Sequence, residues 1–361
     1  MAQNAIQTGV LGVSGYAGME LARLLLHHPR LQTKKPVFFG REAAASPLTD
    51  LHPQLAGNNG SGSLLVEPFS WELAKERGVE LLFLATPHEQ SRSWAPTALE
   101  QGLRVVDLSA AWRLQHATNR KVYDFHDIDE AAAGEVQAKS IYGLPELHRE
   151  CIRTARIVAN PGCYATSIIL ALKPLVSAGW VDLERGIVCD AKSGVSGAGK
   201  APTPNTHFMY AADNLSAYAV FGHRHMGEIT EQLGISEEEI IFTPHLLPIP
   251  RGILSTIYVT FREKKDAGEV EARFREFFAG SPMVRIFGGA RGGAGASGMH
   301  SLPQIQYSVR TNYCDIGFRL AKDGRRCIVI SCLDNLLKGA AGQAVENMNL
   351  MCGWGEAEGL A

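Results

Sequence analysis

Cys163 directly follows a proline and a glycine, which end regular structure, and precedes a stretch with a helical pattern. It follows an Asn-Pro-Gly sequence, and apolar residues recur after it at positions 168, 169, 172, 175 and 176. This spacing predicts a helix with one buried face that starts at or near Cys163. A helix N-terminus offers free N–H groups and the positive end of the helix dipole, which favour a thiolate over a thiol and can hold an oxyanion. Cys163 is therefore a candidate nucleophile.

The chain has seven cysteines, and most cysteines in proteins are inert packing residues. We expect that inert role of the other six, which are Cys151, Cys189, Cys314, Cys327, Cys332 and Cys352. The odd total of seven and the lack of a Cys-x-x-Cys pair indicate free thiols in a reducing compartment. Position alone leaves open that Cys163 is one more buried thiol.

Two histidines and a glutamate follow later in the chain, at a spacing suited to acid–base chemistry. His225 and Glu228 are three residues apart, so on a helix they share a face and Glu228 can orient the imidazole. A histidine–carboxylate pair is the usual arrangement of a general acid/base. Two alternatives remain: His223, His225 and Glu228 could bind a metal ion, or the histidines could be ordinary polar residues. We expect no metal, because no fourth ligand is evident.

Three glycines lie between a predicted strand and a predicted helix near the N-terminus. In such a turn Gly12 permits the tight bend, Gly15 lets the backbone approach a pyrophosphate, and Gly18 allows the helix to pack closely on the strand. The spacing is G-x-x-G-x-x-G, with Ser14 in place of the usual second glycine. The pattern predicts dinucleotide binding, and the alternative is a glycine-rich turn without a ligand.

Arg41 follows the second predicted strand, which ends at Gly40. Enzymes that use NAD usually carry an acidic residue at this place to hold the ribose hydroxyls. A guanidinium suits the 2′-phosphate of NADP instead. We therefore expect NADP(H), although Glu42 is a confounding neighbour and Arg41 could be a plain surface charge.

The first part of the chain alternates apolar runs with helical segments. A helix is predicted for 19–29, with Leu21, Leu24 and Leu25 on one face. Strands are predicted for 5–12, 35–40, 79–87, 103–109 and 155–162. Strands separated by helices indicate an α/β fold with a Rossmann-type, doubly wound parallel sheet.

The sequence becomes richer in strands from about residue 180. Strand-like runs cover 186–197, 253–261, 313–321 and 326–334, and 269–280 has the pattern of an amphipathic helix. These features predict a second domain of α+β type. The glycine-dense segment 288–298 reads as a flexible loop.

Residues 334–353 are helical again, with apolar residues spaced for one buried stripe, at Leu336, Leu337, Ala340, Ala344, Met348 and Met351. A helix that follows a β-rich domain can pack back onto the first domain. We therefore predict a discontinuous Rossmann domain of residues 1–160 plus 334–361 and a second, α+β domain of residues 161–333.

Composition sets limits on the function. A length of 361 residues favours two domains, and a net charge of −2 with 20% charged residues gives no reason to expect nucleic acid or a membrane surface as a partner. No apolar run approaches the ~20 residues that span a bilayer. The N-terminal stretch lacks the pattern of a signal peptide. We expect a cytoplasmic protein.

Nine segments between residues 7 and 353 together resemble the N-acetyl-gamma-glutamyl-phosphate reductases, relatives of aspartate-semialdehyde dehydrogenase. They are GVSGYAG, DLSAAWRL, YGLPELHRE, NPGCYAT, SGVSGAGK, HRHMGEI, FTPHLLPIPRGILSTIYV, NYCDIG and DNLLKGAAGQAVENMNLM. The resemblance implies an NADPH-dependent reduction of N-acetyl-gamma-glutamyl phosphate to the semialdehyde, with release of phosphate, in arginine biosynthesis. It also implies a homodimer or homotetramer.

The resemblance implies roles for particular residues. Cys163 forms a thioester, His225 moves a proton, and Glu228 assists it. The dinucleotide is held by Gly12, Ser14, Gly15, Tyr16, Gly18, Arg41, Ser196, Gly197 and Asn335. The acyl phosphate is held by Ser109, Arg113, Asn160, His223 and Arg251. Arg113 and Arg251 could instead tie loops together, and Ser109 could only cap a turn.

Two other functions compete with this interpretation. A sister acyl-phosphate reductase would act on aspartyl or aminoadipyl phosphate with the same catalytic groups. A cofactor-binding regulator would keep the fold without a reactive Cys163. The presence of a thiol, a histidine–glutamate pair and a cofactor turn in one chain argues against the regulator.

Overall fold

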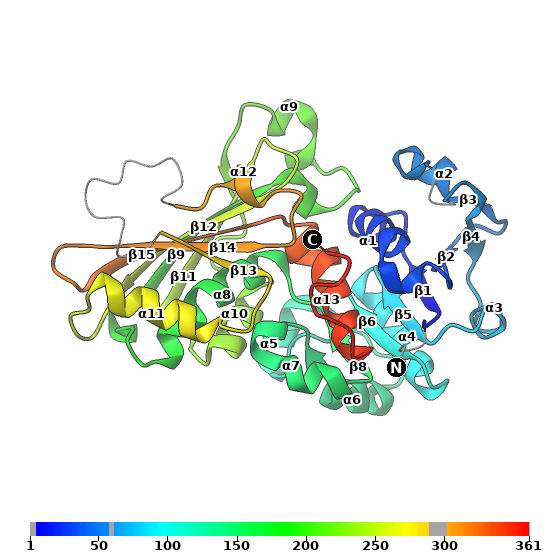
Figure 1. The fold of residues 1–361 in the computed structure, drawn as a ribbon, viewed down its shortest axis with the longest axis horizontal. Coiled ribbons are helices and arrows are strands. Elements are labelled where there is room, and N and C mark those ends of the chain that lie inside the picture. Colours follow the sequence, from blue (N-terminus) through cyan, green and yellow to red (C-terminus); the bar gives the residue numbers. More distant parts are fainter. Residues whose placement is uncertain (1–4, 58–60, 289–301, 361) are drawn as a thin grey trace. The chain divides into compact units, whose positions relative to one another are not determined.

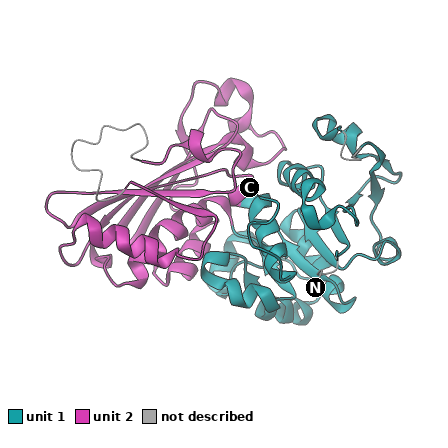
Figure 2. Ribbon diagram, in the orientation of Figure 1, with its two compact units in different colours: residues 1–161, 340–361 teal, residues 162–339 magenta. Residues whose placement is uncertain are grey.

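The computed structural model describes residues 5–57, 61–288 and 302–360. The chain divides into two compact units: residues 1–161 with 340–361 form unit 1, and residues 162–339 form unit 2 (Figure 2). The glycine-dense segment 288–298, predicted as a flexible loop, lies almost wholly outside the described residues. In the described part of the chain, no helix is both long and apolar enough to cross a membrane.

Unit 1 is built on an eight-stranded sheet with helices packed around it (Figure 1). The strand order is β3 (Ser46–Pro47), β4 (Leu65–Pro68), β2 (Val37–Gly40), β1 (Thr8–Leu11), β5 (Leu81–Leu84), β6 (Arg104–Asp107), β8 (Ile157–Ala159) and β7 (Ile141–Tyr142). All neighbouring strands are parallel except β3, which is antiparallel to β4. The predicted doubly wound parallel sheet is confirmed, and each predicted strand of this domain is present.

The strands of unit 1 form because their apolar residues are buried on both faces. All four residues of β1 and of β5 are buried, as expected for a parallel sheet covered by helices on both sides. The helices are α1 (Tyr16–His27), α2 (Leu48–Leu51), α3 (Trp71–Glu76), α4 (His88–Glu100), α5 (Ala117–Arg120), α6 (Glu130–Lys139), α7 (Pro145–Thr154) and α13 (Gly342–Met351). The predicted face of α1 is confirmed, since Leu21, Leu24 and Leu25 are buried.

The C-terminal segment differs from its prediction in two ways. It begins with a π-helical turn at Leu337–Ala341 before α13. The predicted apolar positions Ala344, Met348 and Met351 are buried, but so is every other residue of α13, so burial is not confined to one stripe. The helix lies between α7 and α1 and reaches β6, which leaves no face of it to solvent. Its polar residues are held accordingly: Asn349 bonds the His28 ring at 3.0 Å.

Unit 2 is a mixed seven-stranded sheet with its long helices on one face (Figure 1). The order is β10 (Ser216–Ala217), β11 (Ile240–Leu247), β9 (Ile187–Gly194), β12 (Ile253–Thr260), β15 (Arg326–Leu333), β14 (Cys314–Leu320) and β13 (Val284–Phe287). The helices are α8 (Cys163–Ser177), α9 (Phe208–Ala211), α10 (Met226–Leu233), α11 (Ala267–Phe277) and α12 (Ile305–Ser308). The predicted α+β type is confirmed.

Helix α8 is fixed to this sheet by apolar packing and by a buried serine cluster. It packs on β12 and β15. The Ser167 hydroxyl lies 2.9 Å from Ser255 Oγ and donates to Ser331 Oγ at 3.1 Å, and all three serines are buried. A buried polar cluster of this kind is satisfied in only one register. The N-terminus of α8 is therefore held at a defined place on unit 2.

The unit boundaries differ from the predicted domain boundaries mainly at residues 334–339. These residues belong to unit 2, because Asn335 accepts a hydrogen bond from Gly252 at 2.8 Å and Asp334 pairs with Arg251 at 3.5 Å. The segment returns to unit 1 only at residue 340.

Candidate active site

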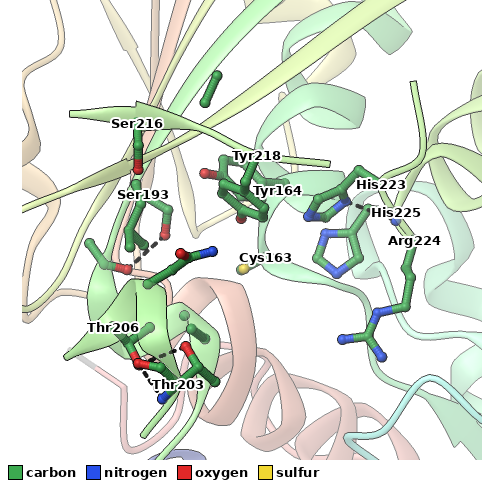
Figure 3. Close-up of a pocket in the computed structure, with 16 residues that line it drawn as sticks. Cys163, Tyr164, Ser193, Thr203, Thr206, Ser216, Tyr218, His223, Arg224 and His225 are labelled. Atoms are coloured by element: carbon green, nitrogen blue, oxygen red, sulfur yellow. Dashed lines mark hydrogen bonds between the residues drawn. The ribbon is translucent and has the colours of Figure 1, made fainter. Parts of the chain in front are cut away.

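A cavity of about 380 Å³ opens in unit 2 around Cys163 (Figure 3). Its walls come from the start of α8, the end of β9 with the turn that follows, residues 203, 205, 206 and 216–218, and residues 223–225. The cavity is lined by both polar and apolar side chains, the usual character of a small-molecule site. Cys163, His223 and His225, which the sequence singled out separately, meet here.

Cys163 is the first residue of α8, as the sequence predicts, and Gly162 is its N-cap. The helix start carries no side-chain cap and no acidic residue in its first turn. The positive end of the helix dipole is therefore not offset by a neighbouring carboxylate of the same turn, which favours an anion at this position. The half-buried Cys163 reaches the cavity.

His225 lies directly beside the start of α8. A Cβ atom on Gly162 would stand 2.5 Å from Nε2 of His225, so only glycine leaves room for the ring there. Nε2 of His225 is 4.0 Å from the Glu228 carboxylate. This is an ion-pair distance and too long for a hydrogen bond.

Glu228 is completely buried in the first turn of α10. Its carboxylate accepts a hydrogen bond of 2.9 Å from the N–H of Gly162. The predicted pair of Glu228 and His225 is therefore in ion-pair range, and the same carboxylate also binds the backbone next to Cys163. It anchors the nucleophile's helix as well as facing the imidazole.

His223 is a neutral partner rather than a cation in this cavity. Its Nδ1 accepts a hydrogen bond of 3.1 Å from the backbone N–H of His225, and the two rings are 4.7 Å apart. Burial lowers the pKa of His223 to about 3, with further lowering by His225 and Arg224. Because Nδ1 is an acceptor, the ring proton resides on Nε2, where it can be donated.

The cavity residues that were not predicted from the sequence include Tyr164, Tyr218 and Arg224 (Figure 3). The Tyr164 hydroxyl donates to the carbonyl of His245 at 2.8 Å, and burial raises its pKa. Burial also raises the pKa of Tyr218 to about 12. Both hydroxyls therefore stay protonated. Tyr164 directly follows the nucleophile and Arg224 separates the two histidines, so both had a signal in the sequence, whereas Tyr218 had none.

The glycine turn predicted to bind a dinucleotide lies in unit 1, and its backbone geometry fits that role. Gly12 has a φ of +88°, and a Cβ there would stand 2.3 Å from the carbonyl of Ala85. A Cβ on Gly18 would stand 2.3 Å from the Gly12 carbonyl, so close helix–strand packing requires glycine. At Gly15, the N-cap of α1, the nearest atom to a Cβ would be 3.8 Å away.

The start of α1 suits a pyrophosphate. It has no side-chain cap and no acidic residue in its first turn, and Tyr16 is its first residue. Ser14 in the turn and Arg41 after β2 are both exposed. Backbone N–H groups at an uncapped helix N-terminus are a common site for phosphate groups. The residues present therefore fit a dinucleotide.

Ser196, Gly197 and Asn335, predicted to bind the cofactor, lie together in unit 2. The Asn335 amide donates to Ser196 Oγ at 2.9 Å and accepts from the Gly252 N–H at 2.8 Å. A Cβ on Gly197 would stand 3.7 Å from the Asn335 amide. The turn after β9, which lines the cavity through Gly197, is thus tied to the segment after β15.

The five predicted substrate residues fall in both units. Ser109, Arg113 and Asn160 belong to unit 1, and His223 and Arg251 belong to unit 2. Of these, His223 lines the cavity. Arg251 pairs with the buried Asp334 at 3.5 Å.

Ser109, Arg113 and Asn160 hold loops in unit 1. The Ser109 hydroxyl donates to Asp107 at 2.8 Å and accepts from the Ala111 N–H at 3.1 Å, so it caps a turn. Arg113 donates to the Leu108 carbonyl at 3.0 Å. The Asn160 amide contacts Ala340 and Asn347, both at 3.0 Å. Burial raises the pKa of Asp107, and its bonds to Ser109 and Ser91 counteract the rise.

Comparison with known proteins gives the family. Residues 7–155 match the profile described as semialdehyde dehydrogenase, NAD binding domain, and residues 163–335 match semialdehyde dehydrogenase, dimerisation domain. The N-acetyl-gamma-glutamyl-phosphate reductase of Desulfotalea psychrophila is 42% identical over 359 residues, which cover 98% of each chain. That of Methanococcus maripaludis is 38% identical over 357 residues, covering 98% of this chain and 97% of the relative.

The chain belongs to the N-acetyl-gamma-glutamyl-phosphate reductase family. As a member of this family it is an oxidoreductase, and its NAD-binding domain indicates a nicotinamide cofactor. Solved structures support the fold alone: aspartate semialdehyde dehydrogenase II from Vibrio cholerae superposes with a TM-score of 0.66 at 19% identity, covering 96% of this chain and 98% of that one. The enzyme from Candida albicans gives 0.66 at 15% identity, over 96% and 98%.

Proposed function

We propose that this reductase converts N-acetyl-gamma-glutamyl phosphate to N-acetylglutamate semialdehyde and phosphate with NADPH, in arginine biosynthesis. The observation that carries the proposal is the position of Cys163 at an uncapped helix start, with the His225 ring against Gly162 beside it. The identity to reductases of this name over nearly the whole chain supports the substrate.

The first step is an acyl transfer to Cys163. The thiolate attacks the acyl carbon, a C–S bond forms, and the C–O bond to phosphate breaks, so that inorganic phosphate leaves. The N–H groups in the first turn of α8 hold the negative charge that develops on the acyl oxygen. The enzyme thereby exchanges one difficult displacement for two easier steps.

The second step reduces the thioester. The nicotinamide cofactor, when bound, supplies a hydride to the acyl carbon. His225 gives a proton to the oxygen that gains charge and takes it back as the C–S bond breaks, so the aldehyde leaves and Cys163 returns as thiolate. Glu228, at 4.0 Å from the ring, stabilises the imidazolium form of His225. His223, neutral with its proton on Nε2, and the cationic Arg224 are the groups of this cavity suited to the anionic substrate.

The cofactor proposed is NADP(H), bound by the glycine turn of unit 1 with Arg41 on its 2′-phosphate. Ser196, Gly197 and Asn335 are proposed to contact the cofactor from unit 2. Ser109, Arg113, Asn160 and Arg251 remain proposed substrate residues. The geometry that supports the dinucleotide is the open backbone at Gly15 and the uncapped start of α1.

The protein is further proposed to be a cytoplasmic homodimer or homotetramer. Support comes from the match to a dimerisation domain and from the seven free cysteines. A row of exposed apolar side chains crosses four adjacent strands of unit 2 in register: Ile241, Val188, Tyr258 and Ile328. Along each strand these residues alternate with buried ones, so they lie on the sheet face opposite to the one on which α8 packs.

The reaction is tested in the oxidative direction with NADP, phosphate and one semialdehyde at a time. N-acetylglutamate semialdehyde should be oxidised at least about 100-fold more efficiently than aspartate or aminoadipate semialdehyde. Faster oxidation of either alternative would identify a sister enzyme and overturn the proposal. Cys163→Ala should lose more than about 10³-fold in activity, as expected for a lost nucleophile. Cys151→Ser, at an exposed cysteine of unit 1, is the matched control and should retain activity.

A further inference from the structure

One wall of the catalytic cavity belongs to a segment of unit 2 that exposes many large apolar side chains. Residues 203, 205, 206 and 216–218 line the cavity around Cys163. Between and after them lie large apolar side chains with exposed fractions of 47% to 78%, namely Phe208, Met209, Tyr210, Leu215, Val220 and Phe221. We call residues 203–222 the apolar arm. Exposed apolar side chains gathered in this way mark a contact surface.

The composition of the apolar arm is that of an interface core. Asp213 is its one acidic residue, and lysine and arginine do not occur in it. Depletion of charge with enrichment of aromatic residues and methionine distinguishes the centre of a protein–protein interface from ordinary surface. A solvent-exposed loop of this length would carry more charge.

The backbone of the apolar arm is held in unfavourable conformations. Asp213, Ala219 and Phe221 have φ values of 54°, 45° and 57°, in the left-handed region that bulky residues avoid. Such residues persist where surrounding packing enforces them. The exposed side chains of Phe221 and its neighbours do not gain that packing within unit 2.

The apolar arm rises from the open face of the sheet. Its β10 pairs with β11 at the edge, and α9 stands on the side opposite to α8 and α11 (Figure 1). The row of Ile241, Val188, Tyr258 and Ile328 faces this same side. The apolar arm is therefore continuous, through β11, with the face proposed for dimerisation. A two-fold interface uses the same surface of both copies, so it contains both features.

We infer that a second copy of this chain covers the apolar arm, and that the catalytic cavity has a firm wall only in the dimer. The inference rests on the homo-oligomer proposed above and extends it to the active site. In the separated subunit the apolar arm keeps its exposed side chains and Tyr218 loses its fixed place beside Cys163. Association of the subunits thus sets the activity of each cavity.

The test uses the whole protein and three variants. The double variant Phe208→Ser, Met209→Ser alters the apolar arm at residues that do not line the cavity, and Tyr258→Arg alters the distant row. Ile128→Ser is the matched control, because Ile128 is a 94% exposed apolar residue of unit 1. Thermal unfolding shows whether each variant is folded, and sedimentation velocity over a range of concentrations gives the dissociation constant.

Both interface variants should weaken the dimer at least about tenfold, as for interface centres, and Ile128→Ser should not. Tyr258→Arg should also speed amide hydrogen exchange in residues 207–221 and lower kcat, although Tyr258 is outside the cavity. Diluting the wild type below the dissociation constant of the dimer should likewise speed exchange in residues 207–221 and lower kcat. A monomeric wild type, or a monomeric Tyr258→Arg with unchanged exchange in the apolar arm, would overturn the inference. Sedimentation and exchange need no substrate, so they decide it even if the proposed reaction fails.

Discussion

The backbone N–H of Gly162 donates a hydrogen bond of 2.9 Å to the buried carboxylate of Glu228. This contact joins the residue before the nucleophile to the first turn of α10, the helix that follows His225. This hydrogen bond and the absence of a side chain at Gly162 therefore both contribute to the relative position of Cys163 and His225.

Gly162→Ala tests that arrangement. The added Cβ would stand 2.5 Å from Nε2 of His225 and 2.8 Å from Glu228, so the imidazole must move. A misplacement of about 1 Å can cost about 100-fold in rate, and we expect a fall of that size in kcat. Gly134→Ala is the control, because a Cβ there has open space. Unchanged kcat in Gly162→Ala would show that His225 does not act from this position.

Two substitutions separate the roles of Glu228, which binds the Gly162 N–H and places a negative charge near His225. Glu228→Gln keeps an oxygen for the Gly162 N–H but removes the charge near His225. We expect its stability to stay within about 1 kcal/mol of wild type, while Glu228→Ala loses about 1–3 kcal/mol because a buried N–H is left without its partner. Urea unfolding measures both.

The pH dependence of the rate then shows whether Glu228 acts on His225 or only stabilises the fold. With Glu228→Gln, the limb that reports protonation of His225 should shift to lower pH, because the neighbouring charge no longer favours imidazolium. A profile identical to the wild type would mean that Glu228 serves the fold alone.

Arg41 should decide between the two nicotinamide dinucleotides. Removing a charged contact to the 2′-phosphate loses about 1.5–3 kcal/mol, so Arg41→Ala should raise the KM for NADP by at least about tenfold and leave that for NAD nearly unchanged. Glu42→Gln, at the adjacent residue, is expected to alter neither. Equal changes in the KM values for NADP and NAD would mean that a residue other than Arg41 binds the 2′-phosphate.

His223 should make the folded state sensitive to acid. Its pKa is lowered to about 3 by burial, whereas the unfolded chain protonates it near 6.5. Below pH 6.5 the unfolded state binds the extra proton, so stability is highest above pH 6.5 and falls by up to about 1.4 kcal/mol per pH unit toward pH 3.

The measurement compares wild type with His223→Gln by urea unfolding at pH 7 and pH 5. The wild type should lose about 2 kcal/mol more than the variant over this interval, since other titrating groups act equally in both. His116→Gln, at an exposed histidine of unit 1, should follow the wild type. If His223→Gln loses as much stability between pH 7 and pH 5 as the wild type, the His223 ring is not buried in its neutral form.

Much of the fold could be predicted from local pattern. Buried parallel strands read as continuous apolar runs, and the Asn-Pro-Gly before Cys163 marked the start of α8 to the residue. The burial of the polar residues of α13 could not be predicted, because their partners, such as His28 for Asn349, lie far away in the sequence and leave no trace in the hydrophobic periodicity.

The candidate site was predictable where its residues are close in sequence. His223, Arg224 and His225 form one motif, but the contact of Glu228 with Gly162 spans 66 positions and has no local signal. Tyr218 joins the cavity from a segment that sequence analysis passed over. The resemblance implied a substrate role for Asn160, and in the structure its amide bonds Ala340 and Asn347 of its own unit.

The return of residues 340–361 to unit 1 has a consequence for biosynthesis. During translation the chain of unit 2 is complete when Gly339 is made, whereas unit 1 still lacks the buried helix α13. The domain whose synthesis begins first therefore cannot complete its packing until the last part of the chain has been made, and until then the surfaces of α1 and α7 that receive α13 stay uncovered. A premature stop near the end of the message would spare unit 2 and leave the nucleotide-binding domain without a central piece.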